Sequence, residues 1–172
     1  MTKKHTGDYC GISEMQLYLF NEGTNYQAYK MLGSEKTDKG TRFAVWAPNA
    51  ERVSLAGDFN NWTGDGYPLE KIGTTGVWYG TFSDIKDGAL YKYAITRNGE
   101  TILKADPFAR YSEVRPGTAS IVRDISDYTW HDKSWLSKRS KSAPYHKPML
   151  IYEMHLGSWK TPDDGSFYNY AE

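Results

Sequence analysis

Apolar and polar side chains alternate with a period of two between residues 41 and 124, a pattern typical of β-strands that bury one face. The segment TRFAVWA shows it clearly, because Phe43 and Val45 share one face while Ala44 and Trp46 share the other. The alternation continues in ERVSLAG, VWYGTF and ALYKYAIT, and more briefly in TILK and ASIVRD. The pattern therefore predicts a series of short strands.

Turn-forming residues separate these strands at intervals of about 8 to 12 residues, as in antiparallel sandwiches. The strongest hairpin signal is Asn98-Gly99, because this pair suits a tight two-residue turn between strands. The predicted fold class is mainly β, with an immunoglobulin-like antiparallel β-sandwich over residues 37–125. Cys10 is the only cysteine, so apolar packing must hold the sandwich together without an internal disulfide.

Two short helices are predicted in a helical extension over residues 1–36. Ser13 and Thr24 each precede a glutamine by three positions, the spacing of a capping box at a helix start. The second helix is expected over residues 25–32, ending at Gly33, because glycine tolerates the left-handed conformation found after a helix.

After the sandwich the chain becomes polar, and residues 126–148 are predicted to form a linker anchored by Trp130 and Trp135. Residues 149–156 are then apolar enough to predict a buried strand, although only a short polar and Tyr-rich segment follows them. A strand of this kind needs neighbours that pair with it, and without them residues 149–156 are expected to be disordered, to pair with the edge of another sheet or to mediate dimerisation.

Composition excludes several functional classes. Lys plus Arg and Asp plus Glu both number 21, so a net charge of +0 gives no reason to expect nucleic acid as a partner. No stretch has the length of a membrane span and no secretory leader is apparent, so we expect no membrane partner and a cytoplasmic location. The informative excess is aromatic, with 14 Tyr, 6 Trp and 6 Phe.

The chain shows no motif for a metal, a cofactor or catalysis. The four histidines are far apart in the sequence, and none has a second His or Cys at ligand spacing. Nucleotide-binding glycine motifs and the nucleophile elbow are missing. We therefore predict no metal, no cofactor and no catalytic residue in this chain.

One loop has the composition of a sugar site. Residues 57–69 follow a predicted strand and place Trp62 beside the amides of Asn60 and Asn61. Sugars have apolar faces that stack on flat aromatic rings and hydroxyls that bond to amides or charges. Lys92 is a charge within a strand and is the fourth candidate. In the alternative interpretation, Trp62 packs under its own loop and Lys92 only faces solvent.

Five stretches resemble the N-terminal portion of bacterial 1,4-alpha-glucan (glycogen) branching enzymes: LYLFNEGTNYQAYKMLG, GTRFAVWAPNAERVSLAGDFNNW, GALYKYAI, KADPFA and IYEMHLGSWK. The resemblance covers residues 17–172. It implies that the β-sandwich is a glucan-binding module in front of a (β/α)8 catalytic barrel, and that residues 149–172 contain the barrel's first strand. Such a barrel takes about 250 residues, so the chain is expected to stop just inside it.

The family's retaining chemistry uses two carboxylates on later barrel strands, beyond Glu172. The resemblance thus implies α-1,4-glucan partners (glycogen, amylose and maltooligosaccharides) and contact with the enzyme's own barrel. A related glycogen-binding module of a kinase regulatory subunit matches Trp62 and Lys92, but its second stacking tryptophan has no counterpart after Gly99. The alternatives are a stand-alone glucan-binding or scaffolding module, the module of a debranching enzyme, or a purely structural domain.

Overall fold

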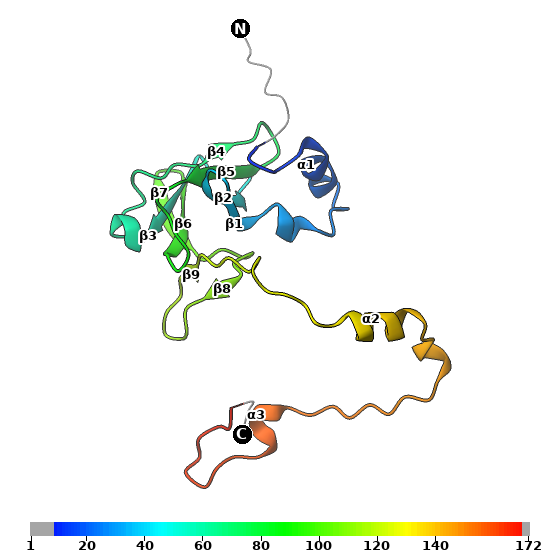
Figure 1. The fold of residues 1–172 in the computed structure, drawn as a ribbon. Coiled ribbons are helices and arrows are strands. Elements are labelled where there is room, and N and C mark those ends of the chain that lie inside the picture. Colours follow the sequence, from blue (N-terminus) through cyan, green and yellow to red (C-terminus); the bar gives the residue numbers. More distant parts are fainter. Residues whose placement is uncertain (1–8, 170–172) are drawn as a thin grey trace. The chain divides into compact units, whose positions relative to one another are not determined.

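The computed structural model describes residues 9–169, which form two units divided after Asp127 (Figure 1). The first unit contains all the strands, and the second contains only short helices and irregular chain. No helix within the described range is both long enough and apolar enough to cross a membrane.

The first predicted helix is confirmed and the second is not. Helix α1 covers Glu14–Asn21, and the side chains of Ser13 and Gln16 form the expected capping box. In place of the second helix there is only the 3₁₀ turn η1, Ala28–Lys30. The amide of Asn25 accepts a bond from the backbone of Gln27, and this local turn competes with helix formation.

One four-stranded sheet has the order β1-β2-β5-β4, and every pair in it is antiparallel. Its strands are β1 (Gly33–Thr37), β2 (Gly40–Trp46), β4 (Glu70–Lys71) and β5 (Val77–Phe82). Strand β1 lies almost entirely in the stretch that the sequence pattern assigned to the helical extension. Gly33, with φ of 91°, begins this strand and does not end a helix.

The second sheet has the order β3-β6-β9-β8, with β7 also paired to β6, again antiparallel throughout. Its strands are β3 (Arg52–Gly57), β6 (Leu90–Arg97), β7 (Glu100–Lys104), β8 (Tyr111–Ser112) and β9 (Ser120–Ile121). The hairpin between β6 and β7 turns at Asn98 and Gly99, with φ of 51° and 77°, as the sequence predicts. The antiparallel β-sandwich is therefore confirmed.

Large apolar side chains from both sheets fill the space between them. Phe43 from β2 meets Tyr91 from β6 edge-on, with ring centroids 4.9 Å apart. Helix α1 covers the other face of the first sheet, where Leu17 and Met31 join a second buried cluster with Ala44 and Val77. This arrangement leaves one face of β3 and β6 for the loop described below.

The second unit does not contain the predicted strand. Residues 149–155 have no regular structure, and the short helix α3 (Leu156–Trp159) begins where the strand was expected to end. Helix α2 covers Lys133–Ser140 and the 3₁₀ turn η3 covers Pro144–His146. A strand gains its backbone hydrogen bonds from neighbours, and no strand is present among residues 128–169 to supply them. The predicted anchors Trp130 and Trp135 are 71% and 55% exposed.

Candidate functional site

The loop after β3 folds back over the outer face of the second sheet. It begins with the 3₁₀ turn η2, Asp58–Asn60, and passes so close to β6 that a Cβ at Gly64 would lie 3.1 Å from that of Ala94. It then returns along β3, where the Leu55 amide donates to the Tyr67 carbonyl at 3.0 Å. The loop is thus tied to the sheet along its length.

The side-chain amide of Asn60 bonds to backbone groups of this loop and of the end of β3. Its side-chain oxygen accepts from the Gly57 amide at 2.9 Å, and its side-chain nitrogen donates to the carbonyls of Leu55 and Asp65 at 3.0 and 2.9 Å. The next residue, Asn61, has a left-handed backbone and an exposed amide. The structure therefore separates the two predicted asparagines, because only Asn61 presents its amide to solvent.

Trp62 and Lys92 come together from separate elements. Lys92 lies on β6 between Tyr91 and Tyr93, which point into the core, so its side chain takes the outer face. Its ammonium nitrogen lies 5.8 Å from the ring centroid of Trp62, within the range of a cation–π contact. Both side chains are partly buried, so the pair forms a fixed surface feature.

Thr118 completes the group and was not predicted from the sequence. Its hydroxyl oxygen lies 2.6 Å from the ammonium nitrogen of Lys92 and accepts its hydrogen bond. The residue follows the Pro116-Gly117 turn, just before β9, which pairs with β6. The pairing of β9 with β6 brings Thr118 beside Lys92. The pattern of side chains along a single strand does not show which strands pair, so it could not predict this contact.

A buried network beneath this face fixes β6. Tyr91 and Tyr93 donate their hydroxyls to one carboxylate oxygen of Asp106 at 2.6 and 3.2 Å, and the Phe108 amide donates to the other oxygen at 2.8 Å. Burial raises the pKa of Asp106 above its usual value, while these three hydrogen bonds oppose the shift. The Asp106 amide donates to the hydroxyl of Ser120 at 2.8 Å, which links the network to β9.

This arrangement suits binding of a neutral polyhydroxyl compound. A partly exposed indole provides a flat apolar surface, and the ammonium, hydroxyl and amide groups around it provide hydrogen bonds. Across residues 9–169 no group of three or more His, Cys, Asp or Glu side chains is arranged to hold a metal ion.

Comparison with known proteins shows similarity over nearly the whole chain. The 1,4-alpha-glucan branching enzyme GlgB of Geobacillus stearothermophilus is 47% identical over 167 residues, which are 94% of this chain and 26% of that enzyme. The GlgB of Nitrosomonas europaea is 48% identical over 94% of this chain and 23% of its own length. The chain thus spans about a quarter of the length of these relatives, and the predicted resemblance to branching enzymes is confirmed.

Among solved structures, the maltotriose complex of PulA from Klebsiella pneumoniae aligns with 56% of this chain and 11% of its own, at 29% identity and a TM-score of 0.48. Residues 17–109, more than half of the chain, match the family described as carbohydrate-binding module 48, the isoamylase N-terminal domain. The chain therefore belongs to the carbohydrate-binding module 48 family.

Proposed function

We propose that this chain is the N-terminal segment of a cytoplasmic glycogen branching enzyme. Such an enzyme transfers a segment of α-1,4-glucan to a 6-hydroxyl and so forms an α-1,6 branch. The support is the identity of 45 to 48% with enzymes of that name over more than nine tenths of the chain. In this proposal residues 1–36 form an N-terminal extension whose last four residues belong to strand β1 of the sandwich. Residues 37–125 form the rest of the glucan-binding module, 126–148 a linker and 149–172 the start of the catalytic barrel.

The segment's own role in this proposal is to bind α-1,4-glucan at Trp62, Lys92 and Thr118. The observation that carries it is the convergence of an indole, an ammonium and a hydroxyl from three separate elements onto one face of the sheet. A glucose ring stacks on the indole of Trp62, while Lys92 donates hydrogen bonds to its hydroxyls. Glycogen, amylose and maltooligosaccharides all present such rings.

The geometry provides this site before a ligand arrives. The three hydrogen bonds of the Asn60 amide hold the loop that carries Trp62, and Thr118 restrains the long side chain of Lys92. Less side-chain entropy is lost on binding when the binding groups are already held in place. Asn61 presents an exposed amide next to the indole and is the remaining candidate contact.

Calorimetric titration with maltoheptaose or β-cyclodextrin tests the site. The unaltered chain is expected to give saturable heat. Trp62→Ala is expected to weaken binding about 5- to 150-fold, if loss of a ring stacked on an aromatic side chain costs about 1–3 kcal/mol, as it does for stacked bases. Trp130→Ala is the matched control, because Trp130 is also exposed but lies in the other unit. Equal binding by the Trp62→Ala variant would refute the proposed site.

Catalysis is expected to need the remainder of the enzyme. The two carboxylates of retaining chemistry are proposed to lie beyond this chain, so the chain alone should leave the iodine spectrum of amylose unchanged. Clear branching by the chain alone would contradict this assignment. Absence of heat from every sugar would instead favour the competing role, in which the module only supports the barrel.

A further inference from the structure

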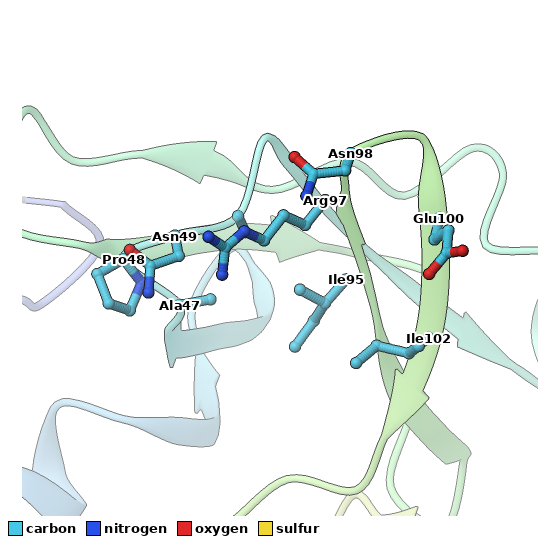
Figure 2. A pocket seen from close by; sticks show the side chains of 9 residues that line it. Ala47, Pro48, Asn49, Ile95, Arg97, Asn98, Glu100 and Ile102 are labelled. Atoms are coloured by element: carbon cyan, nitrogen blue, oxygen red, sulfur yellow. The ribbon is translucent and has the colours of Figure 1, made fainter.

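A groove of about 360 Å³ opens at one end of the sandwich, between the turn over residues 47–50 and the β6–β7 hairpin (Figure 2). Ile95 and Ile102 lie side by side in it, and Ala47 and Ala50 extend the apolar floor. The side chain of Arg97 reaches across the groove towards the turn (Figure 2). The groove therefore has an aliphatic floor under a polar rim.

The hairpin places this floor on the inner face of the sheet. Ile95 belongs to the side of β6 that packs in the core, and Ile102 is its direct partner on β7, so both point the same way. Ile102 is nevertheless 51% exposed and does not belong to the buried core cluster that Ile95 packs against. The inner face of the sheet is therefore about half exposed to solvent at Ile102.

The walls of the groove are held together. The Glu51 carboxylate accepts from the Asn98 amide at 3.1 Å, and the Glu51 amide donates to the Thr96 carbonyl at 2.9 Å, joining the turn to the hairpin. The Trp78 indole donates to the Ala47 carbonyl at 2.9 Å and fixes the other side. The groove therefore exists before any partner binds.

Two features determine what fits. None of the nine lining residues is aromatic, so the groove lacks a platform on which a sugar ring could stack. Nine residues are also far fewer than the roughly 20–30 per side that hold independent proteins together. A weak contact of this size suffices when the partner is covalently tethered, because the linkage raises its effective concentration to the millimolar range.

We propose that this groove docks an apolar side chain from the catalytic part of the same polypeptide. This rests on the proposed function, in which the chain is about a quarter of a branching enzyme and the other three quarters are permanently linked to it. The docked side chain covers Ile95 and Ile102, and Arg97 and Glu100 at the rim pair with polar groups around it.

Docking in the groove leaves the sugar site open. Lys92 and Ile95 lie on opposite faces of β6, since they are separated by an odd number of positions along one strand. A partner on the inner face at the hairpin therefore does not cover Trp62 on the outer face. The module can hold the catalytic part with one surface and glucan with the other.

Cysteine labelling tests the docking, with the adjacent residue as a matched control. Ile102→Cys and Leu103→Cys change neighbouring aliphatic residues on opposite faces of β7, which are 51% and 42% exposed. Each variant is prepared in this chain alone and in a chimera in which the chain replaces the corresponding segment of the Geobacillus stearothermophilus enzyme. Maleimide labelling is followed by peptide mass spectrometry.

We expect labelling of Ile102→Cys to be at least tenfold slower in the chimera than in the chain alone, and that of Leu103→Cys to be unchanged. Equal rates for Ile102→Cys in both proteins would overturn the proposal, as would slowing at both positions. Protection of Ile102→Cys that grows with the concentration of the chain alone would also overturn it, in favour of a second copy. Glucan titration and branching by the chimera are measured separately, so failure of the proposed function is distinguishable from failure of docking.

Discussion

Residues 9–127 and 128–169 are both rich in large apolar side chains but use them in opposite ways. In the first region Phe43, Tyr91 and Tyr93 are fully buried between two sheets. In the second region Leu150 is fully exposed and Ile151 is 82% exposed. The difference shows that apolar side chains form a core only where paired strands hold them together. The strands of the first region pair with one another.

The helices of the two regions differ in the same way. Helix α1 begins with a complete capping box and buries Leu17 against the sheet. Helix α2 is similar in length, but Asp132 at its N-cap makes no capping hydrogen bond, and none of its residues is buried. A short helix in water needs such support, so the two regions should respond differently to matched substitutions.

The largest difference is expected from loss of a core side chain. Phe43→Ala should lower the free energy of unfolding by about 3–5 kcal/mol, because it removes a fully buried ring and leaves a cavity. Leu150→Ala in the second region should change it by less than about 0.5 kcal/mol. Urea denaturation followed by circular dichroism measures both. A comparable loss of stability from Leu150→Ala would contradict the conclusion that the apolar side chains of the second region form no core.

A smaller loss is expected from Asp106→Asn, which replaces one of two accepting oxygens in the buried network of the first region. The expected cost is about 1–3 kcal/mol, because a hydrogen bond to a buried group is lost. Asp164→Asn is the control in the second region, where the carboxylate is exposed and accepts from the Ser166 amide. Urea denaturation at neutral pH should show a loss for the first variant only.

The same variant tests the pH dependence. Burial raises the pKa of Asp106 in the folded protein above its unfolded value, so the folded state binds more protons between these two values. The contribution of Asp106 to stability therefore falls as pH rises from about 3.9 through the folded pKa. Asp106→Asn should remove this slope. An unchanged slope in the variant would mean that other groups cause it.

The smallest effect is expected at the helix starts. Ser13→Ala should cost about 1 kcal/mol, since the Ser13 hydroxyl caps the Gln16 amide of α1. Asp132→Ala at the start of α2 should cost almost nothing, because its side chain caps no amide. Thermal denaturation of the two variants, read as a shift in Tm, measures the difference. An equal decrease in Tm for both variants would show that both helices depend on their N-cap side chains.

The sequence predicts the strands around Phe43 and the β6–β7 hairpin well because local and distant interactions agree there. The alternation around Phe43 and the Asn98-Gly99 turn are local signals, and the sheets confirm them. The second helix and the strand over residues 149–156 were predicted from equally local signals and are absent. In the first case a side-chain turn at Asn25 competes with the helix, and in the second no neighbouring strand is available.

The candidate sugar site, too, could be predicted from the sequence only in part. Composition alone identified the loop with Trp62, and alternation placed Lys92 on an outer face. Neither signal could show that the side-chain amide of Asn60 bonds to the backbone of its own loop, or that the Thr118 hydroxyl accepts from Lys92. Both hydrogen bonds depend on how the folded backbone is arranged. Such contacts follow from strand pairing, which the pattern along one segment does not determine.

The proposal that the sandwich alone carries the glucan site is tested most directly by nuclear magnetic resonance of the six tryptophan indole N–H groups during titration with maltoheptaose. The account predicts a saturable shift of the Trp62 signal, no shift of Trp130 or Trp135, and loss of the response in Lys92→Met. Shifts confined to the second region, or no shift of Trp62 at saturating sugar, would contradict it.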